Sequence, residues 1–71
     1  MEEINISTDF IKLDALLKFS ALAGTGGEAK MMIGEGLVSV NGEVCTMRGK
    51  KIHDGDEIAY NGEVIHVHQH T

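Results

Sequence analysis

The fold is decided by the stretch Gly36-Leu37-Val38-Ser39-Val40-Asn41-Gly42-Glu43-Val44. Its two valines alternate with a serine, which is the period-two pattern of a half-buried strand. The Asn-Gly step that follows is the strongest short signal for a tight hairpin, because both central residues of the favoured turn need a positive φ. The same four letters, Asn-Gly-Glu-Val, return at Asn61–Val64 between two further apolar runs. We therefore predict that the C-terminal half forms a small antiparallel sheet of hairpins.

Two helices are predicted upstream of this sheet. The first begins at Leu13 and is ended by Gly24, and the second follows Thr25 and ends near Glu35. In each, apolar or small residues recur at i, i+3, i+4, i+7 and i+8, which places them on one helix face. These stripes are Leu13, Leu16, Leu17, Ser20 and Ala21 in the first helix, and Ala29, Met32, Ile33, Gly36 and Leu37 in the second. Thr25 and Glu28 have the spacing of a capping box.

A short edge strand is predicted at Glu2 to Ile6, where polar and apolar residues alternate. The expected order is therefore a short N-terminal strand, a helix pair and a small antiparallel sheet, which is an α+β fold. Apolar residues of both helices and the sheet are expected to form one core: Leu13, Leu16, Leu17, Ala29, Met32, Ile33, Val38, Val40, Ile52, Ile58 and Val64.

The composition is that of one small domain. The chain has 71 residues, of which 42% are hydrophobic and 24% charged, so we expect a single domain over residues 1–71. A lone cysteine, Cys45, excludes an internal disulfide and a cysteine-based zinc site. The acidic start is unlike a signal peptide, and no apolar run is long enough for a membrane span. We therefore expect a cytoplasmic protein.

The charges are unevenly distributed. Six Lys and Arg stand against eleven Asp and Glu, for a net charge of -5, which taken alone argues against nucleic-acid binding. Three of the six bases, however, fall within Arg48-Gly49-Lys50-Lys51. Such a run is often only a solvated loop, but in an acidic chain the clustering favours a binding function. Asp54, Asp56 and Glu57 are the acids closest in sequence and would oppose it most.

Several linked motifs resemble one family. They are Ile11-Lys12-Leu13-Asp14, Gly27-Glu28-Ala29-Lys30, the Gly-x-Val-x-Val-Asn-Gly run at residues 36–42, and Gly55-Asp56 before the last hairpin. In this order, with a core motif at residues 11–60, they resemble the RNA-binding domain first named for small-subunit ribosomal protein S-four, also called the alpha-L motif. The length and the Gly-Gly-Glu-Ala-Lys start look most like its short, stand-alone bacterial members of the YaaA and YbcJ type.

The resemblance implies a protein without catalytic activity that binds structured RNA. Its implied partners are ribosomal or transfer RNA, or ribosomal particles, with no membrane or DNA. The contacts carried over from the family are Lys12, Lys30, Arg48, Lys50 and Lys51. Many relatives have Arg where this chain has Gly26, so one phosphate contact of the family is missing. Because aromatic residues make up only 4% of the chain, we expect base stacking to be minor.

The segment Thr25-Gly26-Gly27 supports two interpretations. A helix cap and its loop explain it fully. Alternatively, the free amides at a helix N-terminus, next to two small glycines, could hold a phosphate in place of the missing Arg. For this reason Thr25, Gly26 and Gly27 join the RNA-binding candidates.

We predict neither a metal site at the C-terminal histidines nor a catalytic site elsewhere in the chain. His66, His68 and His70 fall at i, i+2 and i+4 and could bind zinc or nickel. An exposed strand face that ends in a tail also explains them, so we expect no metal and no other cofactor. No common catalytic motif occurs, so we expect no enzyme.

The alternative function is a protein-interaction adaptor that keeps the fold but has lost most RNA affinity, as the acidic net charge and the missing Arg suggest.

Overall fold

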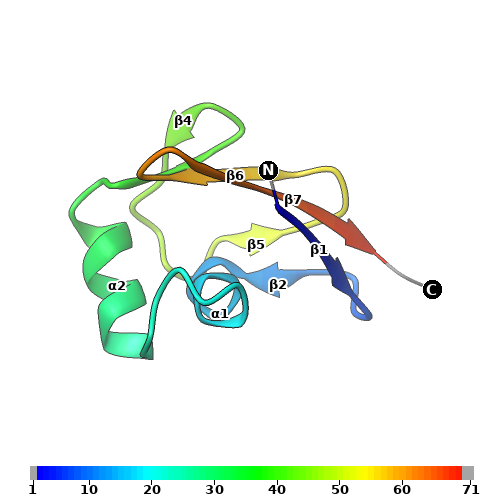
Figure 1. Cartoon of the computed structure of the whole chain (residues 1–71), viewed down its shortest axis with the longest axis horizontal. Helices are drawn as coiled ribbons and strands as arrows, with labels where there is room; N and C mark the ends of the chain where they lie inside the picture. Colours follow the sequence, from blue (N-terminus) through cyan, green and yellow to red (C-terminus); the bar gives the residue numbers. More distant parts are fainter. Residues whose placement is uncertain (1, 70–71) are drawn as a thin grey trace.

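Short strands and two helices make up residues 2–69, the part of the chain that the computed structural model describes (Figure 1). The strands are β1 (Glu2–Ile6), β2 (Ile11–Lys12), β3 (Val38–Val40), β4 (Glu43–Val44), β5 (Lys51–Ile52), β6 (Glu57–Tyr60) and β7 (Glu63–Gln69). The helices are α1 (Leu13–Phe19) and α2 (Gly26–Gly34). The predicted α+β class is confirmed. Neither helix is long and apolar enough to cross a membrane.

Five of the strands form one sheet in the order β1-β7-β6-β3-β4. Its neighbours pair antiparallel except β1, which pairs parallel with β7 at the sheet edge. Both Asn-Gly turns have the predicted backbone, with φ of 52° and 86° at Asn41 and Gly42 and of 51° and 82° at Asn61 and Gly62. The hairpins and the N-terminal edge strand are therefore confirmed.

Helix α1 is shorter than predicted. It ends at Phe19, well before Gly24, because Ala21 takes a left-handed conformation with φ of 66°. The amide of Ala21 donates to the carbonyl of Lys18 at 3.1 Å, which closes the last turn. The predicted stripe therefore stops at the buried Ser20, and Ala21 is exposed.

Helix α2 has the predicted start. The Thr25 hydroxyl accepts a hydrogen bond from the Glu28 amide at 3.1 Å. The helix ends in a Schellman motif, in which Gly36 has a φ of 75° and the Leu37 amide donates to the carbonyl of Met32 at 3.1 Å. This turn carries Leu37 off the helical stripe, and its side chain is 50% exposed.

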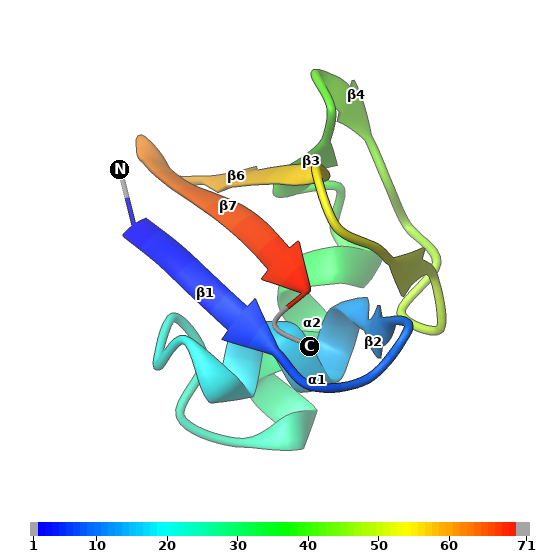
Figure 2. The same ribbon diagram turned by 90° about the vertical axis from the view of Figure 1, so that its right-hand side faces the viewer.

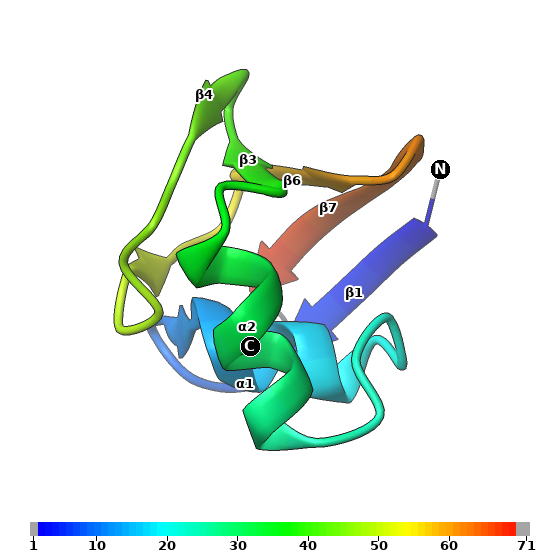
Figure 3. The same cartoon turned by 90° about the vertical axis from the view of Figure 1, so that its left-hand side faces the viewer.

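Both helices cover the same face of the five-stranded sheet, as Figure 3 shows. The core between them contains every predicted residue except Val64, which is half-buried. Side chains alternate along β7, and Ile65 and Val67 are the ones that point inward. The core also contains Ile4, Ile6 and Ala23.

A two-stranded ribbon of β2 and β5 was not predicted. The strands pair antiparallel, with Ile11 opposite Ile52 and Lys12 opposite Lys51. Ile52 is fully buried and fixes the ribbon to the core. In Figure 2 the ribbon lies at the edge of the molecule remote from the start of β1.

Candidate nucleic-acid interface

Residues 48–51, which we call the basic loop, are held against the start of α1 by backbone hydrogen bonds. The first amides of a helix have no partner within it. Here the Leu13 amide donates to the Lys50 carbonyl at 2.9 Å, and the Asp14 amide donates to the Arg48 carbonyl at 3.1 Å. The ribbon register then sets Lys51 opposite Lys12. The structure thereby brings together four predicted candidates, which we call the basic patch: Lys12, Arg48, Lys50 and Lys51.

Within residues 2–69, no side chain of the basic patch forms a salt bridge with a carboxylate. All four side chains are exposed, and within residues 2–69 no Lys or Arg has a carboxylate oxygen within 4.0 Å. Like charges directly opposite one another across two strands destabilise a ribbon. Lys12 and Lys51 form such a pair, and a bound anion would relieve their repulsion.

The acids expected to oppose the basic patch form hydrogen bonds with other residues of the sheet and its turns. The Asp56 carboxylate accepts from the His53 amide at 2.8 Å and from the Asn41 side-chain amide at 3.0 Å. Asp54 accepts from the Gln69 amide at 2.7 Å, and Glu57 pairs with a histidine of β7. These carboxylates therefore stabilise the turns of the sheet.

The ionisation of Asp56 reflects its surroundings. Partial burial, the largest influence, raises its pKa, but the hydrogen bonds from His53 and Asn41 and the nearby positive charges of His53 and Lys50 lower it. The net effect is a pKa below the ordinary value of 3.8. Asp56 is therefore ionised at neutral pH, and it offsets part of the charge of Lys50.

The start of α2 forms a second part of the candidate surface. Thr25, Gly26 and Gly27 are exposed there, and Lys30 projects one turn further along the same helix. Lys30 lies on a different element from the basic patch, and none of the contacts described above joins them. The Thr25 hydroxyl oxygen already accepts the capping hydrogen bond from the Glu28 amide.

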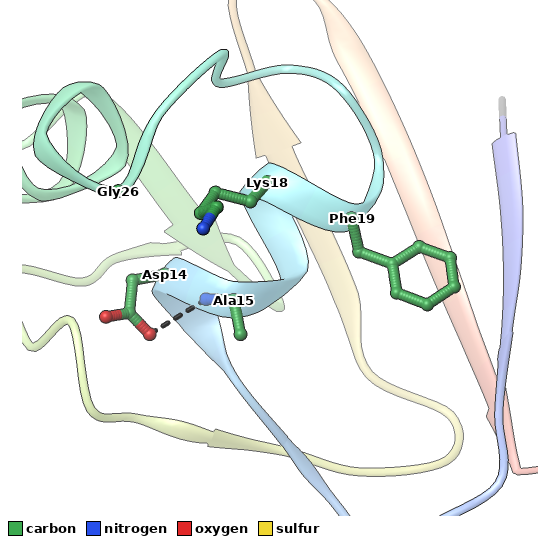
Figure 4. Close-up of a pocket in the computed structure, with 5 residues that line it drawn as sticks. All are labelled: Asp14, Ala15, Lys18, Phe19 and Gly26. Atoms are coloured by element: carbon green, nitrogen blue, oxygen red, sulfur yellow. Dashed lines mark hydrogen bonds between the residues drawn. The ribbon is translucent and has the colours of Figure 1, made fainter.

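Lys18 was missed by the sequence reasoning. In Figure 4, Asp14 and Lys18 extend from the side of α1 that faces Gly26, whereas Phe19 points the other way. An open groove of about 460 Å³ is lined by Asp14, Ala15, Lys18, Phe19 and Gly26. A Cβ atom at Gly26 would lie 3.8 Å from Cδ of Lys18. Lys18 thus lies beside Gly26, where the resemblance led us to expect a missing Arg contact, and only the packing of the two helices reveals this.

The predicted histidine face lies on the sheet surface away from the helices. His66 pairs with Glu57, and Nε2 of His68 is 2.8 Å from Oε1 of Glu3. The strand continues to Gln69, and His66 and His68 lie on its face away from the core. His70 is outside the described residues. Among residues 2–69, no three His, Cys, Asp or Glu side chains gather in a way that would hold a metal ion.

Comparison with known proteins identifies the family. The family model described as the S4 domain matches residues 4–68. A protein of Bacillus subtilis (strain 168), named as a probable ribosome maturation protein, RlbA, is 37% identical over 59 residues, which is 83% of this chain and 83% of that protein. The match extends from β1 to β7 and includes both helices and the ribbon. The chain therefore belongs to the S4 domain family.

Proposed function

We propose that this chain is an RNA-binding protein without catalytic activity, which recognises structured RNA through the basic patch. Membership of the S4 domain family supports RNA as the ligand. The Bacillus relative, named as a probable ribosome maturation protein, supports ribosomal RNA or a ribosomal particle over transfer RNA. In this proposal residues 1–71 act as one unit in the cytoplasm.

One observation carries the proposal: four cations are gathered on a protein whose net charge is -5, and none of them forms a salt bridge with a carboxylate of residues 2–69. Charge repulsion within the patch costs stability, and phosphates bound there would offset this cost. Lys18, Lys30 and the start of α2 would extend the contact along the helix pair.

The acidic remainder of the chain does not prevent this binding. The molecule measures 33 × 22 × 18 Å, whereas charges in physiological salt are screened over roughly 8 Å. Figure 3 shows the start of β1, with Glu2 and Glu3, on the opposite side from the loop between β4 and β5. The repulsion between those acids and a phosphate on the basic patch is therefore almost fully screened.

The proposal is tested by the salt dependence of binding to a ribosomal RNA fragment. If three to five cations neutralise phosphates, the slope of log affinity against log salt should be roughly −2 to −4, at about −0.7 to −0.9 for each contact. Replacing Lys50 and Lys51 together by glutamine should make the slope shallower by about 1.4 to 1.8. Fluorescence anisotropy over a range of salt concentrations measures both quantities.

A control variant with the same change in net charge separates local from overall electrostatics. Asn5→Asp with Asn61→Asp also lowers the net charge by two, at exposed sites on β1 and in the β6–β7 turn. This variant should keep the wild-type slope. If both double variants weaken binding equally, the basic patch is not the binding surface.

A protein-interaction adaptor is the second candidate function. Val44 and Met47 are 63% and 66% exposed and line, together with Cys45, an open groove of about 470 Å³ between the β3–β4 hairpin and the basic loop. Apolar side chains exposed side by side are typical of protein contacts. This function predicts a partner that stays bound at high salt and is lost on Met47→Ser, with no RNA recovered.

A further inference from the structure

The solvent-facing side of the β2–β5 ribbon combines two lysines with two aromatic rings. Side chains alternate along a strand, so residues two apart share a face. Ile11 and Ile52 point toward the core, and Lys12 and Lys51 therefore point outward. The next position in the same register sets Phe10 beside His53, with ring centroids 6.2 Å apart and planes tilted by 50°.

Three of these side chains, those of Phe10, Lys51 and His53, are also close to one another along the ribbon. Nζ of Lys51 lies over the Phe10 ring, 4.9 Å from its centroid, which is a cation–π distance. The His53 amide is fixed by the Asp56 carboxylate, whereas the His53 side chain is 58% exposed. Phe10 is half-buried. A partly exposed aromatic pair thus adjoins the lysine pair, which forms no salt bridge in the part of the chain that the structure describes.

We propose that this face, formed by Phe10, Lys12, Lys51 and His53, binds one unpaired RNA nucleotide, with its base on the aromatic pair and its phosphate on the lysine pair. The inference rests on the proposed function and narrows the ligand to an RNA stem with an unpaired nucleotide beside it. It also revises the expectation that stacking is minor, because the fold brings together aromatic residues that are far apart in sequence.

The dimensions and the chemistry of the face favour this ligand. The aromatic and lysine pairs are two residues apart along the ribbon, or about 7 Å. That separation suits a base and a phosphate joined by one ribose. Paired bases are stacked inside the duplex, and proteins recognise unpaired bases by stacking them on Phe, His and other planar side chains. A duplex without an unpaired nucleotide would meet only the lysines.

The test compares two RNA probes. One is a short blunt RNA stem, and the other is the same stem with a single-stranded 3′ tail that carries 2-aminopurine. The tailed RNA should bind about 5- to 100-fold more tightly than the blunt stem, which is the contribution of one stacked base. The 2-aminopurine fluorescence should be quenched on binding, because its base is stacked.

Variants assign the effect to the face. Phe10→Leu should remove the preference for the tail and the quenching while leaving the salt slope unchanged, because no charge is lost. His53→Ala keeps the hydrogen bond from the backbone amide to the Asp56 carboxylate but removes the ring 3.9 Å from it, and it should weaken the preference in a protein that still folds. Phe19→Leu makes the same chemical change at a 64% exposed ring on α1 and should have no effect.

Two results would overturn the inference. The first result is that the blunt and tailed RNAs bind the wild-type protein equally, with the salt slope expected for phosphate contacts. The second is that the folded Phe10→Leu and His53→Ala variants keep the tail preference. In either case the face does not bind a base, and the proposed function stands without it. If neither RNA binds in a salt-dependent way, the proposed function itself fails, and this inference fails with it.

Discussion

Replacing Lys12 by glutamate should make the protein more stable and a weaker binder of RNA. Lys12 lies opposite Lys51 in the ribbon and immediately before α1, where its side chain makes no capping bond. The change removes a like-charge pair and creates an opposite-charge pair, each contributing about 0.2–1 kcal/mol. It also places a negative charge at a helix N-terminus, which adds about 0.3–1 kcal/mol. Because the site is exposed and screened, we expect a gain near the lower end, about 1 kcal/mol.

Binding should change in the opposite direction. Loss of one phosphate contact should make the salt slope shallower by about 0.7 to 0.9. The repulsion from a carboxylate should weaken binding further at low salt. Thermal unfolding measures the first effect, since about 1 kcal/mol corresponds to roughly 4–8 °C in a domain of this size. Fluorescence anisotropy on the same preparation measures the second.

Two controls isolate the cause of the stabilisation. Lys12→Gln removes only the like-charge repulsion and should give a smaller gain. Lys30→Glu makes the same charge reversal in the middle of α2 and should change stability by less than about 0.5 kcal/mol. The reasoning is refuted if Lys12→Glu destabilises the fold, if its gain persists unchanged in high salt, or if RNA binding is unaffected.

Three further predictions concern the fold that carries the basic patch. Leu17→Ala should cost about 2–5 kcal/mol in urea unfolding, because Leu17 is fully buried between the helices and the sheet; a cost below about 1 kcal/mol would contradict this core. Asp56→Asn should cost about 1–3 kcal/mol at neutral pH by weakening two hydrogen bonds to a charged group. Because the folded pKa of Asp56 lies below 3.8, its contribution is present above that pH and is lost as the pH falls through the lowered value, so the two proteins should converge in acid. Gly36→Ala should lower the free energy of unfolding by about 1–2 kcal/mol, because φ is 75° there. Gly34→Ala, in α2 with open space around its Cβ, should raise it by roughly 0.5–1 kcal/mol. Equal effects of the two substitutions would show that the left-handed turn is not required.

The hairpins and the helix pair could be predicted because their signals are local. An Asn-Gly step determines its own turn, and a stripe at helical spacing identifies both the helix and the face that it buries. The errors are also local in origin. No pattern showed that Ala21 would adopt a left-handed conformation. Naming Val64 as a core residue was an error, because the strand alternation that places His66 and His68 on the outer face puts Ile65 and Val67, not Val64, on the buried face.

The candidate site was harder to predict because it depends on contacts between distant residues. The basic loop was visible as a cluster, but the β2–β5 ribbon has two residues in each strand, which is too short for any periodicity. Without that ribbon, the pairing of Lys12 with Lys51 and of Phe10 with His53 cannot be seen. Lys18 was missed for the same reason, since its position beside Gly26 arises only when α1 packs against α2.

Ultraviolet cross-linking of the protein to RNA in the cell, followed by mass spectrometry of the cross-linked peptides, tests the central claim most directly. The account predicts that RNA is recovered and that the cross-linked residues fall in two segments, Phe10–Lys12 and Arg48–His53. Recovery of no RNA, or cross-links confined to the start of β1, which lies on the opposite side of the molecule from the loop between β4 and β5, would contradict it.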